Sequence, residues 1–273
     1  MTHYRTGLPA WGFAGWENVY FDPGDRLRQY ASVFNCVEGN TTFYATPSEM
    51  TVAGWREQLD GLDFEFCFKL PREVTHEAGN LNRISDFLRA LEPVHEFLGP
   101  FLVQLPAAVG PADSGWIKRL LAHLPDGFDA AVEVRHPAFF ESPDRFDAVL
   151  GETGCFRAIM DARPIHLQGQ DHPEVLAARH EKPDVPVFKL TANGGALVRV
   201  VMHPDDSLNG AYYDEWTTAI AQWLRDEERV WFMMHCPNNL HCPAQARRFH
   251  EALAAKVGIA PLPAWPVSQQ SLF

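Results

Sequence analysis

Short apolar runs alternate with stretches of helical character along most of this chain. The apolar runs predict strands over residues 11–15, 34–38, 64–69, 101–105, 130–135, 156–160, 196–202 and 229–234. The stretches between them predict helices over residues 25–33, 48–59, 82–97, 114–124, 142–150, 212–224 and 245–257. Strands that alternate with helices indicate right-handed crossovers and a parallel sheet.

Eight parallel strands with intervening helices predict an α/β protein with a TIM-like (β/α)8 barrel. We find no internal linker and expect a single domain over residues 1–273, with an extended tail over about residues 261–273. The alternative is an open doubly wound sheet, but no glycine-rich phosphate-binding motif follows the first predicted strand.

The pattern is least regular between residues 162 and 202. Residues 162–186 are rich in His, Pro and charged residues, and a connection of this length is typical of a functional or covering loop. The apolar runs 187–190 and 196–202 flank Asn193-Gly194-Gly195, so they predict either a hairpin or a strand preceded by a short edge segment.

Composition narrows the class of protein. Hydrophobic residues make up 46% of the 273 residues and charged residues 21%, which is typical of a globular protein with a sizeable core. The net charge of -12 disfavours nucleic acid as a partner. We find no secretory leader and no long apolar segment, so we expect a cytoplasmic protein with no membrane contact. The five cysteines are an odd number and three of them lie in apolar runs, which predicts small buried core residues there and disfavours structural disulfides.

Polar residues end nearly every predicted strand, and the active site of such a barrel is assembled from the C-terminal ends of the strands. The fifth strand shows this most clearly, because it ends in Glu133, Arg135 and His136 before Pro137 stops it. The candidates at the strand ends are Glu38, Asn40, Tyr44, Lys69, Gln104, Glu133, Arg135, His136, Asp161, Arg199 and His235.

These candidates divide by chemistry. Carboxylates act as general acids and bases or hold a divalent cation, which makes Glu38, Glu133 and Asp161 catalytic candidates, with His136 as a proton carrier or orienting group. Cationic side chains clamp a phosphate or carboxylate, so the basic candidates predict a small, anionic substrate. The substrate-binding candidates are Asn40, Tyr44, Lys69, Gln104, Arg135, Arg199 and His235.

A structural interpretation of the same residues stays open. Glu133 and Arg135 form an ion pair in the barrel mouth in that interpretation, and His136 caps the end of its strand. A cofactor is not indicated, although a divalent cation remains an alternative.

The segment His235-Cys236-Pro237-Asn238-Asn239-Leu240-His241-Cys242 contains two His and two Cys within eight residues. Structural zinc sites usually space paired ligands by two to four residues, and adjacent His-Cys pairs do not readily face one ion. We favour a strand end at His235, a turn, and a final helix that starts at Cys242-Pro243, where a proline is tolerated.

Four motifs occur in a specific order and spacing. They are Val37-Glu38-Gly39-Asn40-Thr41-Thr42-Phe43-Tyr44, Phe68-Lys69-Leu70-Pro71 with Thr75-His76-Glu77, Val103-Gln104-Leu105-Pro106, and Val132-Glu133-Val134-Arg135-His136. With these motifs the chain resembles the domain of unknown function 72 family, also called YecE-like proteins, over about residues 11–253. The resemblance implies a TIM-like barrel and no established activity. It implies recurrent polar residues at Glu38, Asn40, Tyr44, Lys69, Gln104, Glu133, Arg135, His136 and Arg199.

The chain also departs from the family's pattern. Gly39 stands in the middle of a Glu-hydrophobic-Asn triplet, the residues from Arg199 to His203 replace Arg-x-His-Gly, and His235-Cys236 replaces Asn-Asn. These departures leave the seventh and eighth strand assignments open.

We expect an enzyme that acts on a small anionic or polyhydroxylated substrate by carboxylate and histidine acid-base chemistry at the C-terminal face of the barrel. The reaction class, whether hydrolase, lyase or isomerase, is not distinguished. One alternative is a phosphodiesterase or nucleic-acid repair-like barrel, which requires a basic rim. The other is a non-catalytic ligand- or partner-binding protein, in which the ionisable residues lock one another in ion pairs.

Overall fold

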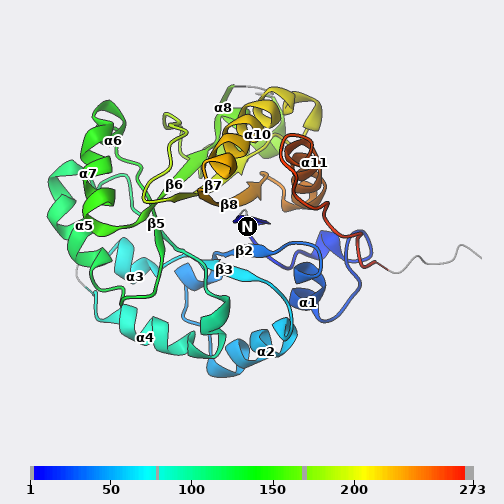
Figure 1. Ribbon diagram of the computed structural model, residues 1–273, viewed down its shortest axis with the longest axis horizontal. Coiled ribbons are helices and arrows are strands. Elements are labelled where there is room, and N and C mark those ends of the chain that lie inside the picture. The colour runs from blue at the N-terminus through cyan, green and yellow to red at the C-terminus, as the bar shows by residue number, and fades with distance from the viewer. Residues whose placement is uncertain (1–2, 78–79, 168–170, 268–273) are drawn as a thin grey trace, which may run out of the picture.

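The computed structural model describes residues 3–77, 80–167 and 171–267, and over these residues it has the predicted α/β architecture. Eight parallel strands line a central barrel and helices surround them (Figure 1). The strands are β1 (Tyr4–Gly7), β2 (Cys36–Gly39), β3 (Glu65–Phe68), β4 (Phe101–Gln104), β5 (Ala130–Glu133), β6 (Phe156–Asp161), β7 (Gly195–Val201) and β8 (Arg229–His235). The fold is the predicted TIM-like (β/α)8 barrel.

Backbone hydrogen bonds close the barrel at the two places where the six-stranded sheet meets the two-stranded sheet. Six strands pair in the order β1-β8-β7-β6-β5-β4, and β2 pairs with β3. Between β1 and β2, the amide of Glu38 donates to the carbonyl of Leu8 at 3.0 Å. Between β3 and β4, the amide of Leu70 donates to the carbonyl of Leu102 at 3.0 Å. The carboxyl ends of the strands therefore surround one mouth.

The first strand is not where the sequence predicts it. Residues 11–15 form a loop and the start of a 3-10 helix (Ala14–Trp16), whereas β1 is Tyr4–Gly7. The run is apolar because Trp11 and Phe13 pack against the hydrophobic core from this loop, whereas β1 is short and carries polar residues. Gly7 is required there, since a Cβ at this position would lie 2.0 Å from the carbonyl oxygen of Cys36 on β2.

The predicted helices are present with adjusted ends. Ser48 caps the helix that follows it, because its side chain accepts a hydrogen bond from the amide of Thr51. The long helix predicted over residues 82–97 is divided into an α-helix (Arg83–Ala90) and a 3-10 helix (Glu92–Phe97) with Pro93 in its first turn. The helices are α1 (Arg26–Ala31), α2 (Glu49–Leu59), α3 (Arg72–Thr75), α4 (Arg83–Ala90), α5 (Ser114–Leu121), α6 (Ala138–Glu141), α7 (Pro143–Thr153), α8 (Arg163–Leu167), α9 (Pro173–Arg179), α10 (Gly210–Arg225) and α11 (Cys242–Ala254).

The region after β6 contains helices that the sequence did not predict, whereas the strands that follow it lie where they were expected. Residues 162–186 were expected to be loop-like, but they contain α8 and α9. The run 187–190 forms no strand, and β7 begins after Asn193 and Gly194, which turn the chain with φ angles of 52° and 86°. The seventh and eighth strands therefore lie where the sequence predicts them, and the hairpin alternative is wrong.

Two apolar shells enclose the strands. One fills the barrel interior, and the other lies between the barrel and its helices. All five cysteines are free and buried. Residues 261–267 of the tail have no regular structure, and Trp265 packs against Tyr20 with ring centroids 4.8 Å apart. The remainder of the predicted tail, 268–273, lies outside the described residues. No helix in the described part of the chain is long and apolar enough to cross a membrane.

Candidate functional site

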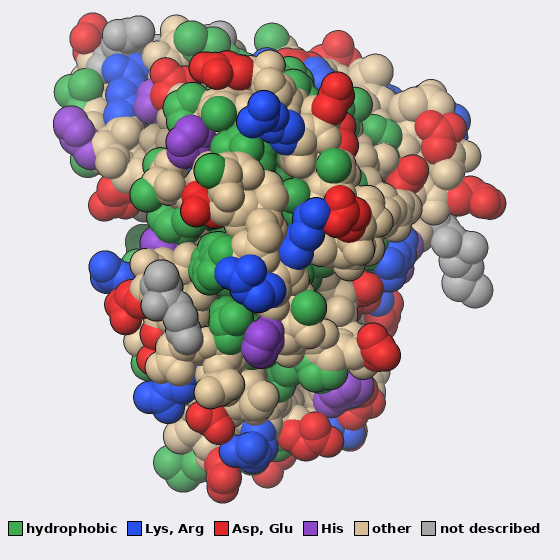
Figure 2. Space-filling view, turned by 90° about the vertical axis from the view of Figure 1, so that its left-hand side faces the viewer, with side chains coloured by type: hydrophobic (Ala, Val, Ile, Leu, Met, Phe, Trp, Pro, Cys, Tyr) green, Lys and Arg blue, Asp and Glu red, His purple; other side chains and the backbone are tan. Residues whose placement is uncertain are grey.

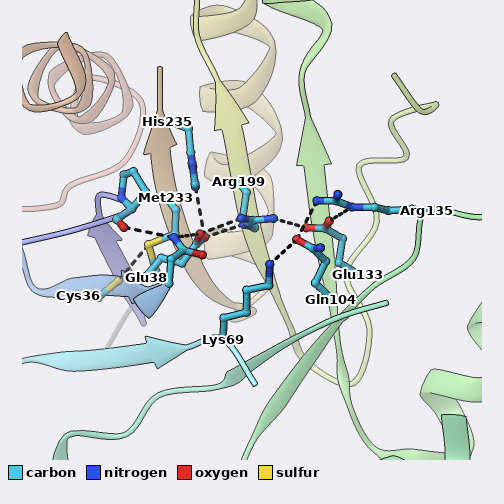
Figure 3. A network of polar contacts seen from close by, with 11 residues as sticks. Cys36, Glu38, Lys69, Gln104, Glu133, Arg135, Arg199, Met233 and His235 are labelled. Carbon is cyan, nitrogen blue, oxygen red and sulfur yellow. Dashed lines mark hydrogen bonds and ion pairs between the residues drawn. The ribbon is translucent and has the colours of Figure 1, made fainter. Parts of the chain in front are cut away.

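Six buried polar side chains meet inside the mouth at the carboxyl ends of the strands (Figure 3). Each lies on the inward face near the carboxyl end of its strand or follows the strand directly, because facing alternates along a strand. They are Glu38, Lys69, Gln104, Glu133, Arg199 and His235. The inward-facing residues one layer deeper are apolar or sulfur-containing.

Arg199 on β7 is the centre of this cluster. Its Nε and Nη2 donate to the two carboxylate oxygens of Glu38 at 2.6 and 2.8 Å, and its Nη1 donates to Glu133. Burial alone would raise the pKa of both carboxyls. The positive charge of Arg199 overrides burial and holds the pKa of Glu38 well below its usual value and that of Glu133 below it. Both carboxylates are therefore ionised near neutral pH and bound to a guanidinium.

Lys69 lies beside this ion-pair system without joining it. Its Nζ donates to Gln104 Oε1 at 3.1 Å and sits 3.7 Å from the centroid of the Phe43 ring. Of the described carboxylates, none lies within ion-pairing distance of Lys69. Burial, followed by the charge of Arg199, lowers the pKa of Lys69 from 10.5 to about 8. The protonated form of such an amine can bind an anion. Its neutral form can accept a proton near neutral pH.

Arg135 connects the two groups. Its Nε donates to Glu133 and its Nη2 donates to Gln104, both at 2.8 Å. The Glu133–Arg135 ion pair of the structural interpretation is therefore present. Arg135 is only part-buried, however, and its free edge faces a cavity.

A cavity of about 1020 Å³ opens above the cluster. Arg199, Lys69, Arg135 and Lys182 line it, whereas Glu38 and Glu133 are not among the described residues that do. The carboxylates lie beneath the guanidinium of Arg199, so the cavity meets cations at its floor. Its remaining polar and aromatic lining includes Asn40, Phe43, Tyr44, Arg72, His76, Gln104, Glu174, Glu181, His235, Asn238 and Asn239.

Two histidines in the cavity are neutral near pH 7. Burial lowers the pKa of His235, and its Nε2 lies 3.3 Å from Glu38 Oε2. Since an ionised carboxylate only accepts hydrogen bonds, Nε2 carries the proton and Nδ1 is the basic nitrogen. Burial, and then the charges of Lys69 and Arg135, lower the pKa of His76 to about 4.

None of the four predicted catalytic residues lines the cavity. Glu38 and Glu133 lie beneath Arg199, and the other two lie elsewhere. Asp161 faces away from the barrel axis, where Arg163 binds its oxygens at 3.0 and 2.7 Å and Trp216 Nε1 donates to it at 2.8 Å. The expectation that Asp161 belongs to the site is thus corrected. His136 does not line the cavity either. Its Nδ1 accepts a hydrogen bond from the amide of Ala138 at 3.1 Å, which agrees with the capping alternative.

The other substrate-binding candidates all line the cavity. Asn40 donates to Glu38 Oε1 at 2.8 Å, and Tyr44 stands at the rim with 80% of its surface exposed. The family's departure at Gly39 also has a physical reason. A Cβ there would lie 2.2 Å from Cδ1 of Phe68, whose ring stacks on Phe66 with centroids 4.7 Å apart.

The His-Cys segment forms a turn. His235 ends β8, a 3-10 helix covers Asn239–His241, and Pro243 stands in the first turn of α11, as predicted. Within the described residues, no three His, Cys, Asp or Glu side chains are grouped to hold a metal ion. The carboxylates at the strand ends are bound to Arg199, so their oxygens are not presented as ligands for a divalent cation.

Several cavity residues escaped the sequence prediction, three of them basic. Lys182 lies in the charged region 162–186, and His76 and Arg72 follow β3. Two signals were available, namely the excess of charge in that loop and the motif Thr75-His76-Glu77. Neither signal indicates that these loops fold over the same mouth.

The comparisons with known proteins agree with this fold. Residues 5–270 match the model of the family described as "Protein of unknown function DUF72". The UPF0759 protein YecE of Escherichia coli strain K12 is 34% identical over 274 residues, which cover 98% of each chain.

Solved structures are similar over nearly the whole chain. A DUF72 family protein from Enterococcus faecalis V583 has a TM-score of 0.71 at 17% identity, with 95% of this chain and 99% of that chain covered. D-psicose 3-epimerase from Clostridium cellulolyticum H10, solved with D-tagatose, has a TM-score of 0.52 at 11% identity, with 94% and 99% covered. At these identities the likeness concerns the fold alone.

Proposed function

This chain belongs to the DUF72 family of proteins of unknown function, and we propose that it is an enzyme that acts on a small anionic substrate in the cavity at the C-terminal face of its barrel. One observation carries the proposal. Lys69 and Lys182 both line the cavity, and within the described chain neither has a carboxylate partner. A part-buried cation without a counter-ion is costly unless a ligand supplies the negative charge.

The charge balance of the site supports an anionic substrate. Of the described residues, five cations line the cavity, namely Lys69, Arg72, Arg135, Lys182 and Arg199, against the lining carboxylates Glu174 and Glu181 and the two buried carboxylates Glu38 and Glu133. The guanidinium of Arg135 offers planar donors of the kind that bind phosphate or carboxylate. Because Glu38 and Glu133 fix Arg199 from below, this cation is preorganised and needs no rearrangement when the substrate binds.

Proton transfer falls to different groups from those that the sequence suggests. We assign Glu38 and Glu133 to holding Arg199, since their lowered pKa values keep them ionised and unable to donate a proton. The amine of Lys69, with its pKa near 8, and Nδ1 of His235 are the acid-base groups of the cavity. About one tenth of Lys69 is neutral at pH 7, which provides a base matched to neutral pH.

Binding and turnover are tested in sequence. The purified chain is titrated calorimetrically with ribose 5-phosphate, glucuronate, inorganic phosphate and the neutral sugar ribose. We expect the anionic compounds to bind and ribose to bind at least tenfold more weakly. Arg135→Gln and Lys182→Gln should each weaken anion binding about tenfold. Lys256→Gln is the control, because Lys256 pairs with Asp214 on the surface and does not line the cavity.

Compounds that bind are then incubated with the enzyme in D2O and followed by proton and phosphorus NMR. Conversion, or exchange of a carbon-bound proton, that is lost in Lys69→Met supports the enzyme. Tight binding without conversion or exchange of any bound compound would instead make the chain a binding protein. Equal affinity for ribose and ribose 5-phosphate would contradict the anion site itself.

A further inference from the structure

A second cavity of about 450 Å³ adjoins the first. Pro106 and Ala107, which follow β4, line one side of it, and residues 180–185 line the other. Four residues line both cavities, namely His76, Arg135, Glu181 and Lys182. The two cavities therefore meet along a shared wall rather than lying at separate places on the barrel.

Positive charge is concentrated at this junction. Arg135 and Lys182 are both part-buried there, whereas the one acidic residue of the shared set, Glu181, is exposed. Burial is the largest cause of the lowered pKa of both Lys182 and His76. Nearby cations lower both further, Arg199 and Arg135 for Lys182 and Lys69 and Arg135 for His76, whereas Glu38 and Glu133 raise the pKa of Lys182. An anion placed at the junction would relieve this repulsion.

The two sides of the junction differ in character. The larger cavity has aromatic and amide groups, including Phe43, Tyr44 and Asn40, which suit a sugar or a ring. The smaller one is bordered by Pro106, Ala107 and Val185 together with exposed polar residues. A ligand that ends in a phosphate at the junction would use the first cavity and leave the second to solvent.

We propose that both cavities hold one small molecule whose anionic group is internal, a phosphodiester or a diphosphate, bound between Arg135 and Lys182 with one part of the molecule on either side. This inference rests on the proposed function and narrows its substrate class. The internal group would place its free oxygens toward the two cations, and the two substituents of the group would follow the two cavities.

The test compares three probes by titration calorimetry with the full chain. ADP-ribose has an internal diphosphate, the dinucleotide thymidylyl-thymidine has an internal phosphodiester, and ribose 5-phosphate has a terminal monoester. We expect at least one internal-anion probe to bind tenfold or more tightly than ribose 5-phosphate. The preferred probe of the two identifies the linkage.

Two matched substitutions separate the cavities. Ala107→Phe fills the second cavity, and Ala177→Phe fills the first; both alanines are exposed, and each lines only one of the two. Ala107→Phe should weaken the preferred internal-anion probe at least tenfold and change ribose 5-phosphate less than twofold. Ala177→Phe should weaken all the probes that bind.

The outcomes distinguish failure of the internal-anion inference from failure of the proposed function. If ribose 5-phosphate binds as tightly as both internal-anion probes, or if Ala107→Phe leaves the preferred probe unaffected, the inference of an internal anion is overturned and the proposed anion site stands. If none of the three anionic probes binds the parent chain, the inference and the proposed function both fail.

Discussion

The two ends of the barrel each enclose an arginine with carboxylates, yet they differ in what covers them. At the N-terminal end, Arg5 on β1 donates to Glu65 at 3.0 Å and to Asp63 at 2.7 Å, and Trp231 Nε1 donates to Glu65 at 2.6 Å. At the C-terminal end, Arg199 binds Glu38 and Glu133 beneath the cavity of about 1020 Å³. The same residue types close one end and leave the other open.

Charge balance explains the difference. At the N-terminal end the carboxylates of Asp63 and Glu65 meet Arg5, with His3 3.7 Å from Glu65, and no cation is left over among these residues. At the C-terminal end cations exceed carboxylates, and among the described residues no carboxylate lies within ion-pairing distance of Lys69 or Lys182. A buried ion pair is therefore weak evidence for a functional site, whereas an unpaired cation beside a cavity is better evidence. The face in Figure 2 shows Lys and Arg interspersed with Asp and Glu.

The largest contrast is expected from removing the arginine at each end. Arg199→Met leaves Glu38 buried without an arginine and Glu133 with Arg135 alone, and we expect the free energy of unfolding to fall by about 3–5 kcal/mol. Arg5→Met should cost about 1 kcal/mol, because Asp63 is 82% exposed and Glu65 keeps its bond from Trp231. Urea denaturation of both variants measures the difference. Equal costs would mean that the ends do not differ in burial of charge.

Lys69→Met separates stability from function at the open end. The folded-state pKa of Lys69, about 8, lies below its ordinary value of 10.5, so protonated Lys69 opposes folding at pH 7. We expect the variant to be more stable than the parent by about 1–2 kcal/mol and to bind anions at least tenfold more weakly.

The sign of this effect depends on pH. Below pH 8 the lysine is protonated in both states and its penalty is complete, and the penalty disappears as the pH rises from about 8 to 10.5. The stability advantage of Lys69→Met over the parent should therefore shrink across this window. Lys118→Met is the control, because Lys118 pairs with Glu152 and is 36% exposed. If Lys69→Met proved less stable than the parent, the positive charge of Lys69 would be balanced by other groups in the folded state.

Anion binding should report the same amine. Ribose 5-phosphate is a dianion above pH 7, and its affinity should fall by up to tenfold per pH unit above about 8, as Lys69 loses its proton. Calorimetry in two buffers of different ionisation enthalpy should detect proton uptake on binding near pH 8. Lys69→Met should lack both effects. A flat affinity between pH 7 and 9 in the parent would assign the anion to the arginines alone.

The sequence was sufficient to predict the barrel and all six residues of the polar cluster. Glu38, Gln104 and Glu133 lie at the ends of short apolar runs, and a run of this kind and length favours a buried strand. The position of β1 was missed because its four residues carry no clear apolar pattern. In a closed barrel even a strand as short as this forms, since its neighbours supply hydrogen bonds on both sides.

The face of a strand end and the path of a loop were harder to predict. Asp161 ends β6 as Glu133 ends β5, but it shares its outward face with Arg157, which reaches Asp147 on α7. Alternation sets which residues share a face and leaves open which face lines the barrel. Lys182 reaches the cavity through a loop whose path is set by long-range packing, and local sequence does not encode that path.

The smallest expected effect completes the comparison at the closed end. Asp63→Asn removes one partner of Arg5, but the Asp63 carboxylate is 82% exposed, so water and salt already screen the pair. We expect a change in unfolding free energy within about 0.5 kcal/mol and no change in anion binding. Glu133→Gln is the matched change at the open end. It removes a charge from a fully buried carboxylate that Arg199 and Arg135 share, and should cost several times more. If Asp63→Asn proved as costly as Glu133→Gln, solvent exposure would not explain the difference between the two clusters. The closed end could then no longer serve as the standard against which the unpaired cations of the open end are judged.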